Sequence, residues 1–492
     1  MNALTDARLA LLRRRMAAAG IAGEHVPART VAAPTANRAQ PGTGEFGIAE
    51  RRMWRIYEFD QDSVSHNIAL VLDFGDTYTL DALVASTELM IGRAAVLGSI
   101  VTVGADGVAR RTPSGVRGRW ADRGRVWEYG TLPAYDGRTD RDGVLAAADV
   151  LARSPFALTK EPPLRVRLYS RADGGVTMIL VVHHLAVDDT SWPALLGTLT
   201  TGAWPEQAGA DGQSAADRPV AAVEDALRHA QRTWAAEDVR FPLSGDLPAL
   251  GAEESWLSPM DDRPGAKLYA PVAPEHRTAL DEVAREVGAT SNALYIAICA
   301  LGVYALTGAA DHVLLVPTDN RRPGDTPDRV GYSGNIVPMR FTFDPTSNLR
   351  EALRSGVAAV YAAMEYSTVD YGAVLTALRG AGGRFPVAEI MASVRNAPLR
   401  GIPVPEGASV SCRSVFNGVG NYPLTFAFEI GAFEIGADER VHLEVDYQTG
   451  IVDEEFAHRA AALLTGLIER IPDRLDIEVG QLVSALREPE VI

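Results

Sequence analysis

Residues 176–192 read VTMILVVHHLAVDDTSW, and the rest of the chain is interpreted outward from them. Val176 to Val182 form a nearly unbroken apolar run, which is typical of a strand buried on both faces of a sheet. The run leads directly into His183 and His184. Because successive side chains of a strand point to opposite faces, one histidine is expected in the core and the other at a cleft.

An imidazole titrates near neutral pH, so a histidine at the end of a buried strand suits general acid–base catalysis. Asp188 and Asp189 follow after a tight loop, and Asp188 could hold this loop through a charge-assisted bond to an arginine. The string is short, however. Two structural histidines beside a solvated aspartate pair explain it about as well.

On both sides of this stretch, apolar periodicity alternates between helix and strand, which predicts an α/β fold. The predicted helices cover residues 51–57, 80–97, 274–287, 291–307, 348–365 and 453–470. The predicted strands cover residues 68–74, 165–169, 176–182, 312–317, 388–395, 422–430 and 440–447.

The predicted strands and helices fall into two large lobes separated by a linker. We expect an N-terminal helix and linker over residues 1–45, a first lobe over 46–203, a linker over 204–219 and a second lobe over 220–492. The linker at 204–219 is polar and rich in Gly, Ala and Pro.

The composition of the 492-residue chain, 47% hydrophobic and 22% charged, is that of a soluble globular protein. Its net charge of −16 makes a nucleic-acid partner unexpected. The uncharged run at 290–310 is long enough for a membrane span but reads better as a buried helix, so we expect no membrane partner. Only two cysteines and no signal-peptide pattern favour a cytoplasmic location.

Several kinds of chemistry have no motif in the chain. It lacks GxSxG, HExxH, CxxC and a phosphate-binding loop, so neither an acyl-enzyme nucleophile nor a bound cofactor is expected. Adjacent histidines on one strand point apart and cannot both bind one ion, so no metal is expected either.

Five short motifs, in one order along the chain, carry a resemblance to a known family. They are AERRMW at 49–54, HHLAVDD at 183–189, VPTDNR at 316–321, VGYSGN at 330–335 and NYPL at 421–424. They resemble AQxRxW, HHxxxDG, a strand ending in Gly-Arg, VGxFVN and YPL of the condensation domains of nonribosomal peptide synthesis. These domains belong to the chloramphenicol-acetyltransferase-like superfamily. The similarity spans residues 46 to about 470.

The resemblance implies two acetyltransferase-like lobes arranged as a V around a channel. An acyl or peptidyl carrier protein would present a donor on its 4'-phosphopantetheine, and a free or carrier-bound amine or alcohol would accept it. With no adenylation-like or carrier-like sequence attached, the chain is most similar to the free-standing (type II) condensation enzymes. It would bind no cofactor of its own.

The resemblance also implies roles for individual residues. His184 would be the catalytic residue, and Asp188 would pair with Arg321 to fix the loop. The residues named as motif support are His183, Asp188, Asp189 and Arg321, and the channel candidates are Trp192, Gly331, Ser333 and Asn335.

Asp189 departs from the family because it stands where the motif has glycine. A loop normally free to adopt positive φ would become restricted there. The second carboxylate would also favour the protonated form of His184.

Three alternatives stay open on the sequence. DDTSW at 188–192 is similar to the motif of epimerization domains, which also act on carrier-bound aminoacyl groups. A non-catalytic carrier-docking module and a carrier-independent acyltransferase are the others.

A basic patch is the candidate docking surface for an acidic carrier. Residues 110–125 hold six arginines and one acid. A solvated loop with balanced charges explains this segment equally well. The docking candidates are Arg117, Arg119, Arg123 and Arg125.

Overall fold

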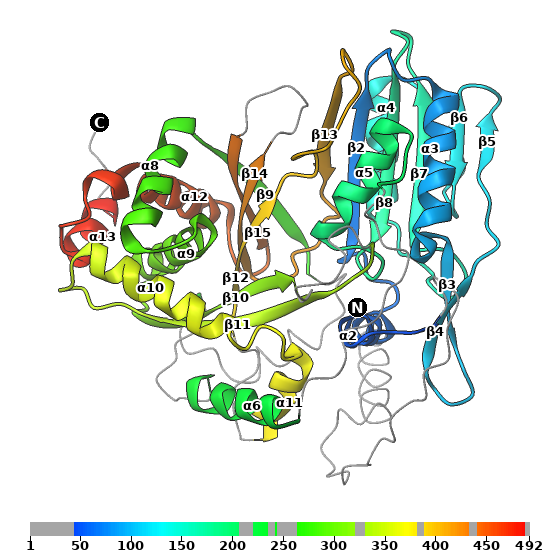
Figure 1. Ribbon diagram of the computed structural model, residues 1–492. Coiled ribbons are helices and arrows are strands. Elements are labelled where there is room, and N and C mark those ends of the chain that lie inside the picture. The colour runs from blue at the N-terminus through cyan, green and yellow to red at the C-terminus, as the bar shows by residue number, and fades with distance from the viewer. Residues whose placement is uncertain are drawn as a thin grey trace.

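The computed structural model describes residues 44–205, 220–234, 242–243, 263–319, 330–380, 388–431 and 440–487. Two six-stranded sheets, each covered by helices, form two lobes that lie side by side (Figure 1). The predicted two-lobed α/β fold is therefore confirmed. The predicted N-terminal helix, nearly all of the linker at 204–219, and Arg321 lie outside the described residues.

The first sheet is antiparallel throughout, in the order β13-β2-β8-β7-β6-β5. Its strands are β2 (Asn67–Phe74), β5 (Arg119–Asp122), β6 (Val126–Tyr129), β7 (Leu164–Ser170), β8 (Val176–His183) and β13 (Val410–Val415). All eight residues of β8 are buried, as their apolar run predicted. This central strand delivers the two histidines at its end.

Helices cover both faces of the first sheet because side chains alternate along its strands. Leu70 and Leu72 of β2 pack in the core with α3 (Leu80–Arg93) and α5 (Trp192–Thr201). Ala69 and Val71 point the other way and share a core with helices α2 (Ile48–Phe59) and α4 (Arg141–Ala152). The remaining elements of this lobe are β1 (Gly44–Glu45), η1 (Ala95–Gly98), β3 (Ser99–Val103), β4 (Ala109–Pro113) and η2 (Asp189–Ser191).

The second sheet is mixed, in the order β11-β10-β12-β14-β15-β9. Its strands are β9 (Gly265–Val272), β10 (Asp311–Asp319), β11 (Gly334–Thr342), β12 (Ile390–Asn396), β14 (Leu424–Gly431) and β15 (Arg440–Gln448). The helices of this lobe are α6 (Val220–Trp234), α8 (Pro274–Val287), α9 (Ser291–Thr307), α10 (Leu349–Met364), α11 (Tyr371–Gly380), α12 (Glu454–Arg470), the short η4 (Ile471–Asp473) and α13 (Val479–Arg487). Most of them cover one face of the sheet, whereas α6 and α11 pack against each other beside its other face.

Helix α9 is the uncharged segment, and it lies where a core helix should. Thr290 caps its first turn, and its residues from Ala293 to Ala305 are buried. Among the described residues, no single helix is long and apolar enough to cross a membrane; only α8 and α9 together pass that test, and they are bent by 97°.

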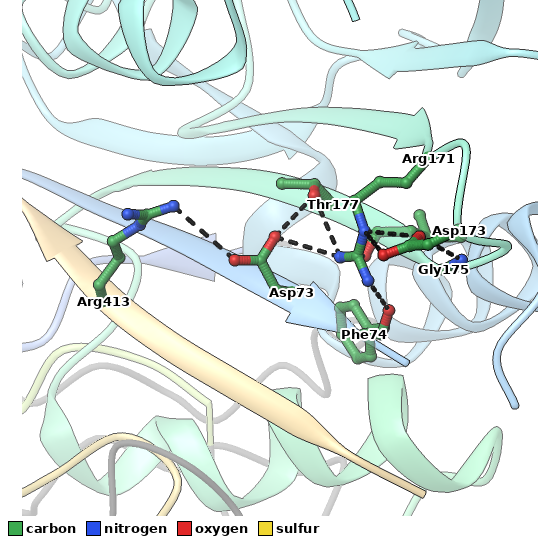
Figure 2. A network of polar contacts seen from close by, with 8 residues as sticks. Asp73, Phe74, Arg171, Asp173, Gly175, Thr177 and Arg413 are labelled. Carbon is green, nitrogen blue, oxygen red and sulfur yellow. Dashed lines mark hydrogen bonds and ion pairs between the residues drawn. The ribbon is translucent and has the colours of Figure 1, made fainter. Parts of the chain in front are cut away.

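Strand β13 corrects the expected boundary between the lobes. Although it lies in the range 220–492 assigned to the second lobe, it pairs along its whole length with β2 of the first sheet (Figure 1). Asp73 on β2 forms an ion pair with Arg413 on β13 and accepts a 2.6 Å hydrogen bond from Thr177 on β8 (Figure 2). The chain therefore crosses back between the lobes.

Candidate active site

His183 belongs to the core of the first lobe. It is 3% exposed, and its Nδ1 accepts a 3.1 Å hydrogen bond from the backbone N–H of Leu185. The rings of Tyr57 and Phe156 meet it edge-on at 5.9 and 6.0 Å. Burial, reinforced by neighbouring positive charge, holds the pKa of His183 well below its usual range. It is a neutral structural residue.

His184 points the other way and is half-buried. Its Nδ1 lies 2.6 Å from the carbonyl oxygen of Val187, and a carbonyl can only accept a hydrogen bond. Nδ1 therefore carries the ring proton, so in the neutral ring Nε2 holds a free lone pair. This tautomer is the one that a general base at Nε2 requires.

Asp188 holds the loop after β8 in place. Its Oδ1 accepts hydrogen bonds from the hydroxyls of Thr190 (2.7 Å) and Ser191 (3.1 Å). Its Oδ2 accepts from the backbone N–H of Ser333 in the second lobe, at 2.9 Å. The expected pairing of Asp188 with Arg321 stays a prediction, since Arg321 lies outside the described residues.

Asp189 does not behave as expected from its place in the motif. It is exposed and opens the short helix η2, and no described non-glycine residue has positive φ, so the loop needs no glycine there. The charge of Asp189 acts electrostatically on Arg395 of the second lobe. Burial alone would lower the pKa of Arg395, but Glu444, Glu429 and Asp189 together raise it.

The four channel candidates take part in packing or in hydrogen bonds that hold the protein together. Trp192 is 5% exposed and packs in the core of the first lobe. Asn335 is 2% exposed, and its amide donates to the carbonyl oxygens of Ser367 (2.6 Å) and Val369 (2.7 Å). The structure therefore does not support a channel-lining role for Trp192 or Asn335.

Gly331 and Ser333 dock the second lobe on the histidine loop. The Ser191 hydroxyl lies 3.3 Å from both the N–H and the carbonyl oxygen of Gly331, and Ser333 binds Asp188 as described above. Both residues therefore position the loop.

Three residues of the lobe boundary were not named as site residues on the sequence, and two of them, Tyr332 and His66, contact His184. Tyr332 lies edge-on to its ring, with centroids 5.1 Å apart. Arg52 on α2 reaches across the lobe boundary to the carbonyl of Gly334 (2.6 Å) and Oδ1 of Asn335 (3.0 Å), and pairs with Asp370. Arg52 lies in the motif AERRMW and Tyr332 in the motif VGYSGN, so these two motifs could have identified them.

His66 is the third missed residue, and no motif announced it. Its carbonyl accepts a 2.8 Å hydrogen bond from the N–H of His184, and its Nδ1 lies 2.9 Å from the hydroxyl of Ser65. Burial, and then the charge of His184, lower the pKa of His66 to about 3. It stays neutral beside His184.

The four docking arginines are gathered at one edge of the first sheet. Arg117, Arg119, Arg123 and Arg125 are all exposed and lie on or beside β5, the edge strand. Arg119 also pairs with the buried Glu128 at 2.9 Å. The role of these arginines in docking a carrier stays a prediction.

The described part of the chain holds neither a reactive thiol nor a cluster of side chains placed to bind a metal ion. Cys299 and Cys412 are free and buried, and burial raises the pKa of both thiols far above neutrality. No group of three or more His, Cys, Asp and Glu side chains in these ranges is placed to hold a metal ion.

No family model matches the chain. An isonitrile lipopeptide synthase of Mycobacterium tuberculosis is 24% identical over 384 residues, which are 74% of this chain and 15% of that protein. The phosphinothricin tripeptide synthetase PhsB of Streptomyces viridochromogenes is 24% identical over 358 residues, 70% of this chain and 29% of that protein. The chain thus spans only a small part of these relatives.

Solved structures give a closer match in extent. The condensation domain of the monacolin K polyketide synthase MokA superimposes with a TM-score of 0.68 at 13% identity, covering 89% of this chain and 99% of that domain. The first condensation domain of the CDA synthetase gives 0.64 at 16% identity, covering 89% and 98%. The chain therefore has the condensation-domain fold and is related in sequence to the nonribosomal peptide synthetases.

Proposed function

We propose that the chain catalyses condensation: it transfers an acyl or aminoacyl group from a carrier-protein phosphopantetheine thioester to an amine or hydroxyl acceptor. The observation that carries the proposal is the state of His184. Its Nδ1 proton is committed to the carbonyl of Val187 at 2.6 Å, at a loop where both lobes meet. Nε2 is left to accept a proton.

The reaction balances on this one residue. The acceptor nitrogen or oxygen attacks the thioester carbonyl carbon and gives its proton to Nε2 of His184. The carbon–sulfur bond then breaks, and the departing sulfur takes the proton back. No acyl-enzyme forms, and holding two tethered reactants together supplies much of the rate.

The surrounding residues act by position. Asp188, Ser191 and Ser333 fix the loop that carries His184, and Arg52 fixes the lobes to each other. The carrier is proposed to dock through the basic patch at the β5 edge, since carrier proteins are acidic as a family.

The test is intact-mass spectrometry of an aminoacyl-loaded carrier protein, incubated with the enzyme and a pool of small amines and alcohols in deuterium oxide. We expect loss of the acyl group together with a new amide or ester, slowed by about 10²–10⁴-fold in His184→Ala. Transfer at the wild-type rate by that variant would refute the role of His184.

Two other outcomes count against condensation. A one-dalton gain on an acyl group that stays attached would show epimerization. Carrier binding without any change in mass, across the whole acceptor pool, would favour a docking module.

A further inference from the structure

A cluster of charged side chains lies on the face of the second sheet opposite its main core. It alternates along the strands with the core residues Phe428, Leu443 and Val445. We call it the cross-lobe charge cluster, and its members are Lys267 on β9, Arg395 on β12, Glu429 on β14, and Glu444 and Asp446 on β15.

The contacts of this cluster leave it short of positive charge. Oε1 of Glu444 receives both Lys267 Nζ (2.6 Å) and Arg395 Nη2 (2.7 Å). The same two cations serve Asp446, 3.4 Å from Lys267, and Glu429, 3.7 Å from Arg395. In the described ion pairs, three carboxylates therefore share Lys267 and Arg395, and His442 lies opposite Glu429 on the same face.

The second carboxylate oxygen of Glu444 has no hydrogen-bond partner among the residues that the structure describes. The Glu444 side chain is 1% exposed, and its Oε2 is buried without a hydrogen bond. In the same cross-strand row, Tyr269 lies on one side of Glu444, and the small residues Ala427 and Ser393 follow on the other. An unpaired buried carboxylate oxygen is costly, so a donor that reached it would be bound favourably.

The two cations satisfy Glu444 at the expense of its neighbours: burial alone would raise the pKa of Glu444, but Arg395 and Lys267 lower it to about 2. Burial and the charge of Glu444 outweigh Lys267 and raise the pKa of Asp446. Burial also raises the pKa of Glu429, in spite of Arg395. Both carboxylates would be more easily ionised beside a further positive charge.

The cluster lies at the lobe boundary that also holds His184. The ring of Phe416, which follows β13, is 5.3 Å from Lys267 Nζ. Asp189, on the loop after His184, acts electrostatically on Arg395 and Glu429 and adds a fourth negative charge. Solvent reaches the cluster, because Asp446 is 24% exposed and the neighbouring Tyr269 is 56% exposed.

We propose that the cross-lobe charge cluster binds a cationic group, an ammonium or a guanidinium, on the acceptor. The acceptor is then a small amine or alcohol with a second, positively charged end. Its reacting end stands at His184 as a neutral nucleophile, and its charged end supplies the missing cation. This inference rests on the proposed function, because that function is what makes the bound cation part of an acceptor. Its test, however, does not require acyl transfer.

The test is calorimetric titration of the full chain, without carrier, with 1,5-diaminopentane and with the neutral 1,5-pentanediol. We expect the diamine to bind and the diol not to. Asp446→Asn should weaken diamine binding about tenfold, the value of one charge-assisted hydrogen bond. Asp446 is partly exposed, so this variant should fold, and its melting temperature checks that it does.

The matched control is Asp173→Asn, which removes one carboxylate from the first lobe, where Asp173 is 66% exposed beside Arg171. It should leave diamine binding unchanged. Equal weakening by both variants would reduce the effect to net charge and overturn the inference, and so would equal binding of the diol.

The two proposals fail separately. Diamine binding that Asp446→Asn weakens, without acyl transfer from any loaded carrier, supports this inference and counts against condensation. Acyl transfer to simple amines, with no measurable diamine binding, supports condensation and overturns this inference.

Discussion

The two sheets carry their charges differently. On the first, two buried carboxylates each pair with a buried arginine of β7: Glu128 meets Arg167 at 2.6 Å, and Glu161 meets Arg165 at 2.8 Å. On the second, Glu429, Glu444 and Asp446 share two cations. Pairing suits a sheet whose task is to hold a strand end still, whereas a surplus of one sign suits a surface that receives a ligand.

The ion pairs of the first lobe hold the backbone segments that surround strand β8, the strand that ends in His183. Arg165 donates to the carbonyls of Ser154 (2.8 Å) and Pro155 (2.7 Å), next to Phe156, whose ring contacts His183. Asp73 joins β2 to Arg171 and Arg413 on either side (Figure 2). These ion pairs therefore position the backbone around the histidine strand.

The contrast between the two sheets can be tested by substitution, and we expect the largest loss of stability from Glu128→Gln. Glu128 is 1% exposed, and its removal leaves Arg167, 4% exposed, without its carboxylate. We expect the free energy of unfolding to fall by about 3–5 kcal/mol, as when one partner of a buried pair is removed. Urea denaturation measures it. A loss below about 1 kcal/mol would mean that the pairing in the first sheet does not support the fold.

The same substitution on the second sheet should act in the opposite direction. Glu429 is also buried, but its pKa is raised, so the folded state disfavours its charge. We expect Glu429→Gln to leave the free energy of unfolding at pH 8 unchanged or to increase it by up to about 1 kcal/mol. A loss as large as that of Glu128→Gln, in the same urea experiment, would erase the contrast between the sheets.

Local patterns gave correct predictions wherever neighbours in sequence set the structure. The apolar run predicted β8, the alternation at His183 and His184 correctly placed one of the two rings in the core, and 291–307 matches helix α9. Strand period and helix capping depend on residues close in the chain, so they can be read without coordinates.

Contacts between segments that are distant in the chain could not be predicted from the sequence. Arg52 meets Asn335, 283 positions away, and β13 joins a sheet of the other lobe. The charge cluster exists only because β9, β15, β14 and β12 pair in one register, which no single strand specifies. Strands β3 to β6, of four or five residues each, were missed because they are short and partly polar.

The smallest expected effect is a pH dependence that arises from Asp446. It is also the sharpest test of the excess of carboxylates on the second sheet. Burial, and then Glu444, raise its pKa to about 6 against the pull of Lys267 and Arg395. A carboxyl whose folded pKa lies above its unfolded value of about 4 lowers the free energy of unfolding as pH rises through that interval. Above pH 6 the free protein therefore bears the cost of an ionised Asp446, and a bound cation relieves it.

Diamine affinity should consequently fall as pH is lowered, because Asp446 takes up a proton while the ammonium group at the cluster stays charged. The expected change between pH 7 and pH 6 is about twofold, set by the ionised fraction of one carboxyl with this pKa. The same titration of Asp446→Asn should be flat over this interval. An equal pH dependence in both proteins would assign it to another group and leave the surplus on the second sheet without a role in binding.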